Sequence, residues 1–309
     1  MRLLRYRTDG RPAAGVVLGD VIAPIDGPDD IVAIIAGDPD ATEAARRAAR
    51  RATATIPLTE VRVLAPLPHP SKYLAVGFNS AAHVAEAATE PISPARAARM
   101  ATNRLLHEAY PDPRWPQLFN KQTTCVQEPY GPIWKPADAT TLDYEGEVAL
   151  VIGRRLRRAS RSQAREAIAG YVVANDVSVR EWQFETAQIW LGKSFETHGP
   201  LGPWVTSADE VDEDGLRIRT WVNGELRQDG RFADQLHGAC EIVSMCSEVC
   251  TLLPGDVIAT GTPAGVGAAS ERYLGIGDVV RVAVDGLGHL ENTVVAEPGD
   301  QATTEANGV

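Results

Sequence analysis

Three acidic residues at alternate positions stand out in the segment LDYEGEVALVIG, which spans residues 142–153. Side chains along a β-strand alternate between its two faces, so Asp143, Glu145 and Glu147 would share one face. Carboxylates two positions apart lie roughly 6–7 Å from each other. When both are ionised, they repel by roughly 2–3 kcal/mol at an effective dielectric constant of about 20. Water, basic side chains or a cation must relieve this repulsion.

The rest of the segment indicates where these acids lie. A solvent-facing acidic stripe on an edge strand is the ordinary explanation of such a pattern. Here Ala149 and Val151 continue the acidic face, which therefore turns apolar at once and favours a site rather than a solvated stripe. The other face is largely apolar and contains Leu142, Tyr144, Val148, Leu150 and Ile152, with Gly146 among them.

A second group of polar residues follows the apolar run in AGYVVANDVSVREWQ. If residues 176–187 are helical, Asp176, Arg180 and Gln183 lie at positions i, i+4 and i+7 and share a helix face. The alternative is structural, because Asp176 could instead cap the turn and pair with Arg180. The segment alone favours neither reading.

A histidine and a glutamate are close together in GFNSAAHVAEAATEP. A helix beginning near Asn79 or Ser80, both good N-cap residues, would bring His83 and Glu86 side by side at i and i+3. An imidazole next to a carboxylate can act as a general base. Most pairs with this spacing are ordinary surface pairs.

Two further segments contain candidate site residues. Lys193 is the one charged residue in the turn LGKS, where a solvated surface lysine is the usual explanation. The segment GDVIATGTPAGVG, which includes Thr262, is rich in glycine and suggests backbone that a ligand can approach closely. It is not a P-loop, because no Gly-Lys-Ser/Thr follows, and no helical pattern opens after it to make a dinucleotide fingerprint.

Composition limits the partners and the location of the protein. The chain has 309 residues and a net charge of -11, which argues against a nucleic-acid or anionic-membrane partner. It does not exclude an anionic substrate, because a local cation can override the global field. No apolar run approaches the length of a membrane span, and the N-terminus has no apolar core of a signal peptide. We therefore expect a cytoplasmic protein with reduced cysteines.

The order of elements predicts an α+β, mainly β fold. Residues 1–66 form a small leading unit, and the prolines between Pro66 and Pro70 mark its boundary. Residues 67–297 form the body, where short apolar runs broken by Gly, Pro and Asp predict strands, with a hairpin at Asn223-Gly224. We expect residues 298–309 to be a disordered tail.

Taken together and in order, the motifs resemble the fumarylacetoacetate hydrolase family, in its bacterial acylpyruvate-hydrolase-like branch, over roughly residues 66–296. The matching strings are VGFNSAAHVAE, FNKQTTCV, LDYEGEVALVIG, GYVVANDVSVREWQ, GKSFETHGPLGPW, VNGELRQ, LLPGDVIATGTPAGVG and GDVVRVAVDGLGHLEN. The resemblance implies a β-roll or distorted β-sandwich catalytic domain behind a small N-terminal α/β domain. It also implies a homodimer.

The resemblance further implies a divalent cation held by three carboxylates, with Mg²⁺ or Mn²⁺ as the cation and Ca²⁺ as an alternative. Its implied ligands are Glu145, Glu147 and Asp176. Its implied catalytic residues are His83, Glu86 and Lys193, and its implied substrate-binding residues are Arg180, Gln183, Lys193 and Thr262. Asp143 would then be a residue behind the ligands or a cap. The chain departs from the family pattern in having Ser80 where tyrosine is usual, no acid in YLAVGFN, and a longer stretch over residues 88–117.

The implied reaction is the hydrolysis of a carbon–carbon bond in a 2,4-dioxo acid, a small-molecule substrate. Rival readings are an oxaloacetate decarboxylase, an isomerase or hydratase of dioic acids, and a non-catalytic metal-binding homologue. We also predict that residues 80–118 form a mobile lid that carries the His83–Glu86 pair. Arginines of this stretch could meet a second substrate carboxylate. The alternative is an ordered surface excursion or a dimer contact.

Overall fold

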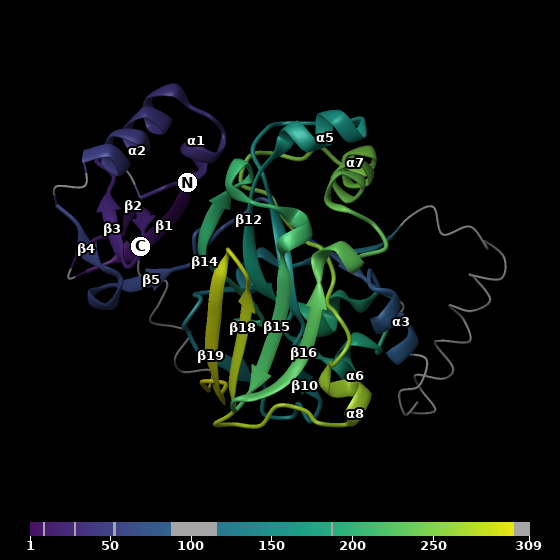
Figure 1. The fold of residues 1–309 in the computed structure, drawn as a ribbon. Helices are drawn as coiled ribbons and strands as arrows, with labels where there is room; N and C mark the ends of the chain where they lie inside the picture. The colour runs from purple at the N-terminus through teal and green to yellow at the C-terminus, as the bar shows by residue number, and fades with distance from the viewer. Residues whose placement is uncertain (9, 28, 52–53, 88–115, 187, 300–309) are drawn as a thin grey trace.

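The computed structural model describes residues 1–8, 10–27, 29–51, 54–87, 116–186 and 188–299 (Figure 1). Most of the stretch predicted as a lid, from residue 88 to 115, lies outside the described residues. So does the predicted tail from residue 300 onward. The architecture is α+β and mainly β, as predicted.

A large mixed sheet runs through the whole molecule, in the order β4-β3-β2-β1-β14-β12-β11-β17-β6-β7, with β5 beside β1 and β8 beside β14. Its strands are β1 (Arg2–Arg7), β2 (Ala13–Leu18), β3 (Val21–Pro24), β4 (Ile56–Pro57), β5 (Arg62–Leu64), β6 (Tyr73–Gly77), β7 (Gln117–Lys121), β8 (Val126–Gln127), β11 (Gly146–Ile152), β12 (Ile168–Asn175), β14 (Gly199–Ser207) and β17 (Val257–Ala259). Because β1 pairs with β14, the sheet of the leading unit continues directly into the body.

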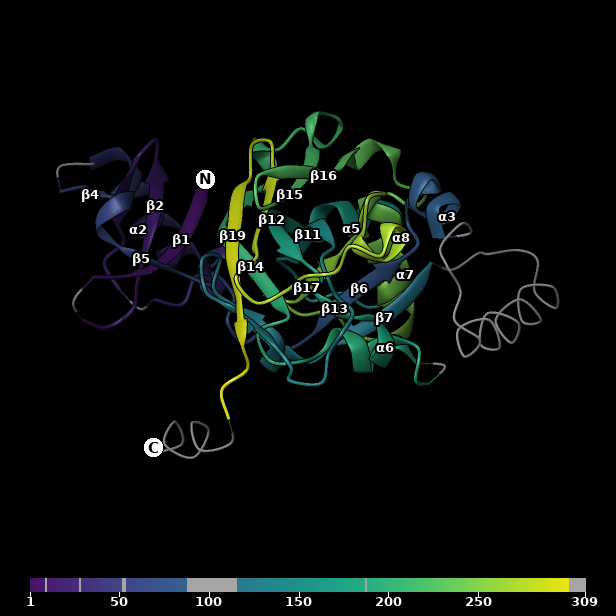
Figure 2. The ribbon, with the colours of Figure 1, turned by 90° about the horizontal axis from the view of Figure 1, so that it is seen from below.

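A second, five-stranded sheet packs against this one (Figures 1 and 2). Its order is β16 (Glu225–Arg231), β15 (Arg217–Val222), β18 (Val279–Val284), β19 (Gly288–Ala296) and β9 (Ile133–Lys135). Asn223 and Gly224, with φ of 51° and 80°, form the two-residue turn between β15 and β16. This confirms the predicted hairpin, because such turns need positive φ at both positions.

Two hydrophobic cores lie on the two faces of β11. Val148 and Leu150 face the core between the two sheets, together with Val282 of β18. Ala149 and Val151 face a second core that also contains Leu3 of the leading unit. Strand β11 is therefore central and buried on both sides.

The helices cover the margins of the sheets. They are α1 (Val32–Ile35), α2 (Pro39–Arg51), α3 (Ala81–Ala87), α5 (Arg161–Ala167), α6 (Arg180–Gln183), α7 (Ala239–Val249) and α8 (Gly267–Ser270), with 3₁₀ helices η1 (Leu58–Glu60), η2 (Thr123–Cys125), η3 (Ile189–Lys193), η4 (Ala208–Glu210), η5 (Glu213–Gly215) and η6 (Phe232–Asp234). Figure 2 shows α3, α6 and α8 at the same end of the molecule as β6 and β7. This end contains the residues discussed below.

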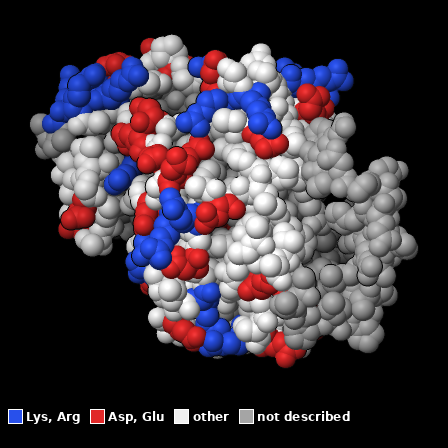
Figure 3. Space-filling view, turned by 45° about the vertical axis from the view of Figure 1, so that its right-hand side comes forward, with Lys and Arg blue, Asp and Glu red and all other residues white. Residues whose placement is uncertain are grey.

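The surface carries both signs of charge. Figure 3 shows acidic and basic side chains intermixed over much of one face, beside a wide uncharged area, with a continuous group of basic side chains at the upper left. Among the helices of the described residues, none combines the length and the apolar character needed to cross a bilayer.

Candidate active site

The acidic residues of the opening motif lie at the end of a central strand. The motif is split into β10 (Leu142–Asp143), which pairs with β13 (Ser178–Val179), and β11, which lies between β12 and β17. Glu145 and Glu147 are 6% and 1% exposed. The reading as a solvated stripe on an edge strand is therefore wrong. The predicted alternation of faces holds, because the two faces of β11 line different cores.

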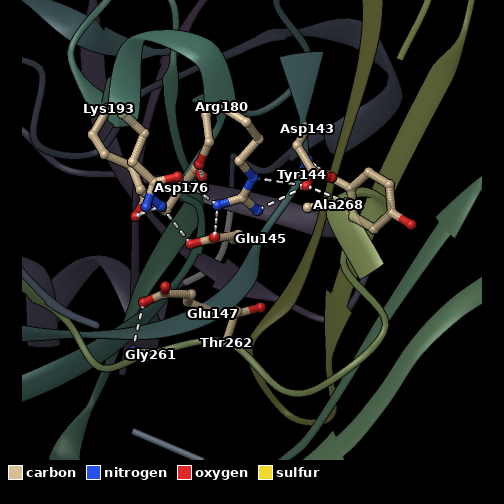
Figure 4. Close-up of polar contacts among 12 residues, drawn as sticks. Asp143, Tyr144, Glu145, Glu147, Asp176, Arg180, Lys193, Gly261, Thr262 and Ala268 are labelled. Carbon is tan, nitrogen blue, oxygen red and sulfur yellow. Dashed lines mark hydrogen bonds and ion pairs between the residues drawn. The ribbon is translucent and has the colours of Figure 1, made fainter. Parts of the chain in front are cut away.

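Antiparallel pairing brings a third carboxylate to these two. Gly146 of β11 lies opposite Asn175, the last residue of β12, and the backbone N–H of Asp176 donates to the carbonyl of Glu145 at 2.8 Å. Glu145, Glu147 and Asp176 each offer an oxygen atom, and these atoms lie within 4.8 Å of one another (Figure 4). All three side chains are buried. The three residues that the resemblance implied as ligands thus form one cluster.

Two buried lysines provide positive charge to the cluster. Lys193 Nζ donates to Glu145 Oε2 at 2.6 Å and to Asp176 Oδ2 at 2.9 Å. Lys121 Nζ donates to Asp176 Oδ1 at 2.5 Å and also contacts the carbonyl of Lys193. The surface-lysine reading of Lys193 is wrong, since its exposure is 2%.

Sequence reasoning missed Lys121, although it stands in the quoted string FNKQTTCV. One signal was present: Lys121 is the only charged residue of β7, and it ends that strand. A single lysine in a strand is not diagnostic, however, because its partner Asp176 lies 55 positions away in the chain.

Arg180 connects the cluster to Asp143 (Figure 4). Its Nε donates to Asp143 Oδ2 at 2.8 Å. Its Nη1 lies 2.6 Å from Glu145 Oε1 and also donates to Gln183 Oε1 at 2.9 Å. Asp143 is fixed in turn by the backbone N–H groups of Gly267 and Ala268. Asp143 therefore orients Arg180 behind the three acids, as predicted.

The helix considered for residues 176–187 is present only over Arg180–Gln183 among the described residues. Ser178 and Val179 form β13 against β10, so the helix α6 begins only at Arg180. The alternative pairing of Asp176 with Arg180 is also wrong, since Asp176 pairs with the two lysines and Arg180 with Asp143 and Glu145. Long-range strand pairing overrides the local helical spacing here.

The three acids differ strongly in their affinity for a proton. Burial acts to raise the pKa of Glu145, but attraction to Lys193 and Arg180 outweighs it and holds this pKa well below its usual range. Burial, Asp176 and Glu145 together raise the pKa of Glu147 well above its usual range, against a hydrogen bond from the Gly261 N–H. Glu147 is thus a buried acid without sufficient counter-charge.

A divalent cation fits this cluster. Carboxylate oxygens are the hard ligands that Mg²⁺ and Mn²⁺ prefer, and each oxygen has lone pairs beyond those that the lysines use. The unbalanced charge at Glu147 is what such a cation would neutralise. The residues present therefore suit the group that the resemblance implied.

The His83–Glu86 pair lies on α3, which Ser80 caps as predicted by accepting from the His83 N–H at 3.4 Å. His83 Nδ1 lies 3.1 Å from Glu86 Oε2. A carboxylate can only accept, so Nδ1 carries the proton and Nε2 is left as a proton acceptor. The ring of Phe78 stacks on the imidazole with centroids 5.5 Å apart.

The glycine-rich segment 255–267 holds both groups in place. The Gly261 N–H donates to Glu147 Oε2, and the Gly265 N–H donates to Glu86 Oε1, each at 2.7 Å. Both glycines have positive φ, 103° and 105°. A Cβ on Gly265 would lie 2.0 Å from the backbone oxygen of Arg227, so only glycine allows this close approach.

Thr262 of the same segment has a structural role. Its hydroxyl donates to the carbonyl of Gly146 at 2.9 Å and accepts from Gln228 Nε2 at 2.8 Å. The hydroxyl proton is therefore used within the protein. The implied contact with substrate can come only from the remaining lone pair or the backbone.

One cavity brings most of the candidate residues together. Its described wall contains His83, Glu145, Arg180, Gln183, Lys193 and Thr262, with Phe78, Phe119, Phe184 and Ile189 among its apolar members. The two ends of the predicted lid are well defined. Helix α3 is anchored through Glu86, and β7, which pairs with β6, begins at Gln117, close to the predicted end of the lid near residue 118. The lid itself falls mainly on residues 88–115, outside the described residues, and stays a prediction.

Comparison with known proteins agrees with these observations. The model of the fumarylacetoacetate (FAA) hydrolase C-terminal family matches residues 72–295, and the Rv2993c-like N-terminal family model matches residues 1–66. Protein Rv2993c of Mycobacterium tuberculosis is 39% identical over 240 residues, which are 77% of this chain and 80% of that protein.

Solved structures with the same fold include a hydrolase and an isomerase. Maleylpyruvate hydrolase from Sphingobium sp. SYK-6, in complex with manganese(II) and pyruvate, is 29% identical with a TM-score of 0.75, over 96% of this chain and 100% of that one. The 5-carboxymethyl-2-hydroxymuconate delta-isomerase from Mycobacterium smegmatis is 36% identical with a TM-score of 0.74, over the same shares of the two chains. The chain therefore belongs to the fumarylacetoacetate hydrolase family and is an enzyme of that family.

Proposed function

We propose that the protein is a metal-dependent hydrolase that cleaves a carbon–carbon bond in a 2,4-dioxo acid of the acylpyruvate type. The observation that carries this proposal is that a His–Glu pair and a three-carboxylate cluster meet at one cavity, which His83 and Glu145 line. A non-catalytic metal-binding protein would need the acids but not the proton acceptor at His83. The manganese and pyruvate in the hydrolase from Sphingobium add support.

Glu145, Glu147 and Asp176 would hold the cation, Mg²⁺ or Mn²⁺. Once bound there, it would supply Lewis acidity and a template for the oxygen atoms of the dioxo acid. Lys121 and Lys193 would orient Asp176 within the cluster, and Arg180 would orient Glu145.

The remaining residues would activate water and stabilise charge. His83 Nε2 would accept a proton from water, while Glu86 holds the ring through Nδ1 and stabilises the imidazolium that forms. The hydroxide would attack the distal carbonyl carbon, C4. The bond between C3 and C4 would then break, giving a carboxylic acid and the enolate of pyruvate, and the proton taken up by His83 would return to C3 of the enolate. Lys193 Nζ, with Gln183 beside it on the cavity wall, would stabilise the negative charge that develops on oxygen.

A substrate panel tests this proposal. Metal-stripped protein is supplied with Mn²⁺ or Mg²⁺, given acylpyruvates and oxaloacetate in separate reactions, and the products are identified by NMR. We expect pyruvate and a carboxylic acid from acylpyruvates, no turnover after chelation, and recovery with either metal. Decarboxylation of oxaloacetate without any cleavage of acylpyruvates would overturn the proposal.

An isomerase of unsaturated dioic acids is the second candidate. It is supported by the isomerase from M. smegmatis, whose identity to this chain is higher than that of the hydrolase from Sphingobium. Isomerisation moves a proton between carbons and needs no attacking water. Incubation in H₂¹⁸O separates the two, because only hydrolysis places ¹⁸O in the carboxylic acid product.

We further propose that the enzyme is a cytoplasmic homodimer that acts on small molecules, not on nucleic acids or membranes. The net charge of -11 supports the exclusion of polyanionic partners. Light scattering coupled to gel filtration measures the assembly directly. A monomeric mass at working concentration would contradict the dimer.

A further inference from the structure

We infer that the cavity is built for a 2,4-dioxo acid whose acyl group is apolar and carries no second carboxylate. This inference rests on the proposed function and adds the substrate class to it. It follows from two independent features of the described cavity wall, its charges and its apolar side chains.

The charges of the site match one substrate carboxylate. The buried cluster contains four acids, Asp143, Glu145, Glu147 and Asp176, and three bases, Lys121, Arg180 and Lys193. With all of them ionised the cluster carries 3 − 4 = −1, and a divalent cation changes this to +1. One carboxylate of the dioxo acid then neutralises the site. A second one would leave an excess negative charge in a buried environment.

No further cation of the described wall is available for a second carboxylate. Apart from His83, the basic residues that line this part of the cavity are Arg180 and Lys193. Both already pair with acids of the cluster, Lys193 with Glu145 and Asp176, and Arg180 with Asp143 and Glu145. The proposed reaction also uses Lys193 at the reacting carbonyl oxygen. A carboxylate away from the cluster would therefore lose its water without gaining a cationic partner on the described wall.

Apolar side chains form much of the rest of the described wall, beside the polar side chains of Gln117, Gln183 and Thr262. Phe119 lies beside the reacting groups, with Lys193 Nζ 5.5 Å from its ring centroid, and Phe78 stacks on His83. Phe184 follows Gln183 directly, and Ile189 begins the 3₁₀ helix that ends at Lys193. Phe78 remains 40% exposed, which leaves an aromatic surface for a ligand to cover.

This wall favours alkyl and aryl groups. Each methylene that is transferred from water onto such a surface strengthens binding by roughly fourfold. A carboxylate at the same position gains nothing from the aromatic rings, whose faces carry partial negative charge. The sequence-based prediction that arginines of residues 80–118 meet a second carboxylate leads to the opposite specificity, and the test below separates the two.

A matched pair of substrates provides the test with the manganese-loaded protein. 2,4-Dioxoheptanoate and 2,4-dioxoheptanedioate differ only in a terminal methyl against a terminal carboxylate. We expect kcat/KM to be at least about tenfold higher for the monoacid. The diacid loses apolar contact worth about one to two methylene groups, and its second carboxylate is left without a cationic partner. Equal or better cleavage of the diacid would overturn the inference while leaving the hydrolase proposal intact.

A binding measurement keeps the inference separate from turnover. N-propyloxamate and N-(2-carboxyethyl)oxamate repeat the methyl-against-carboxylate contrast in compounds without the scissile bond. Calorimetry with Mn²⁺ present should give tighter binding of the propyl compound. If neither dioxo acid is cleaved but the propyl compound binds better, the proposed reaction fails and the apolar subsite stands. Tighter binding of the carboxyethyl compound overturns the subsite.

A variant at the apolar wall completes the test. Ile189→Lys places a cation there and should shift the kcat/KM ratio towards the diacid by at least about tenfold. Ile189→Met, with a similar volume and no charge, should keep the preference for the monoacid. An unchanged ratio in Ile189→Lys, with turnover retained, would show that Ile189 does not face the acyl group and would contradict its assignment.

Discussion

At the scale of single residues, the site separates proton transfer from charge balance. His83 and Glu86 form a pair with a defined tautomer, because the carboxylate fixes the proton on Nδ1. Glu145 and Glu147, two positions apart, experience opposite shifts of their pKa values, since of these two acids only Glu145 is in contact with Lys193 and Arg180. Proton transfer by His83 and charge balance at the carboxylates can therefore be tested separately, each by a substitution that changes the size of the side chain little.

Removing the proton acceptor should abolish hydrolysis but not ligand binding. His83→Gln keeps a hydrogen-bonding side chain and loses the general base, which lowers kcat by roughly 10²–10⁴-fold. The affinities for Mn²⁺ and for oxalate, measured by calorimetry, should remain within about threefold of the wild type. His289→Gln, on the distant strand β19, is the control and should keep full turnover. Wild-type hydrolysis by His83→Gln would make the histidine structural and favour the lyase reading.

Removing one carboxylate charge should act on the cation. Glu145→Gln leaves Lys193 and Arg180 beside a neutral amide, so the cluster becomes more positive and the affinity for Mn²⁺ should fall by more than about 100-fold. Turnover should fall with it. Glu166→Gln changes an exposed glutamate that lies 3.4 Å from Arg154 and should leave both quantities unchanged. Unaltered calorimetric titration of Glu145→Gln with Mn²⁺ would refute the ligand assignment.

At the scale of elements, local signals could be predicted and long-range pairings could not. The cap at Ser80 and the turn at Asn223-Gly224 depend on neighbouring residues, and both follow the prediction. A helix over residues 176–187 does not form, because Ser178–Val179 pairs with the distant strand β10. Leu142 lies opposite Val179 and Asp143 opposite Ser178, a register that local spacing cannot predict. Lys121 escaped notice for the same reason.

The candidate site shows the same division between local and long-range information. The spacing of Glu145 and Glu147 fixed their common face, whereas the addition of Asp176 depends on the register of β11 and β12. Only the resemblance to a family supplied that partner in advance. The structural use of the Thr262 hydroxyl also follows from tertiary contacts, with Gly146 and Gln228.

The glycine-rich segment offers a prediction at this scale. Gly265→Ala should destabilise the protein and lower turnover, because a Cβ would lie 2.0 Å from the backbone oxygen of Arg227 and displace the N–H that holds Glu86. Gly277→Ala is the matched control. Its φ of 93° is equally positive, but nothing lies within 4 Å of its Cβ, so it should lose only roughly 1–2 kcal/mol of stability.

Denaturant unfolding and kcat, measured on both variants, separate strain from steric displacement. Gly265→Ala should lose clearly more stability than Gly277→Ala and should alone lose turnover. Equal unfolding midpoints with unchanged kcat in both variants would show that the segment tolerates the extra carbon and does not position Glu86.

At the scale of the whole molecule, contacts between the sheets hold the site in place. Strand β14 joins the leading unit through β1 and the body through β12, and the segment before it reaches the second sheet. There, Thr197 Oγ1 accepts from the Trp134 N–H and His198 Nε2 donates to the Trp134 carbonyl, both at 2.8 Å. These two residues therefore connect β9 of the second sheet to the main sheet.

This connection should make the stability of the protein depend on pH. His198 is fully buried, and its Nδ1 has no hydrogen-bond partner in the described structure. Burial lowers its pKa from 6.5 to about 3, the Trp134 carbonyl opposes this shift, and Lys121 adds to it. Between these two values the unfolded chain binds a proton that the folded protein does not, so stability falls as the pH falls below about 6.5. At pH 5 the loss from this residue is about 2 kcal/mol.

The control is His198→Gln, which can still donate to Trp134 but does not titrate. The unfolding of both proteins in guanidinium is measured at several pH values with a chelator present. The pH dependence of the acidic cluster is common to both proteins and cancels when their unfolding free energies are subtracted. The difference in unfolding free energy between wild type and variant should then change by about 2 kcal/mol between pH 7.5 and pH 5, with the wild type losing more. If the unfolding free energies of the two proteins change in parallel with pH, His198 titrates equally in the folded and unfolded states. The assignment of His198 as a neutral buried histidine would then be wrong.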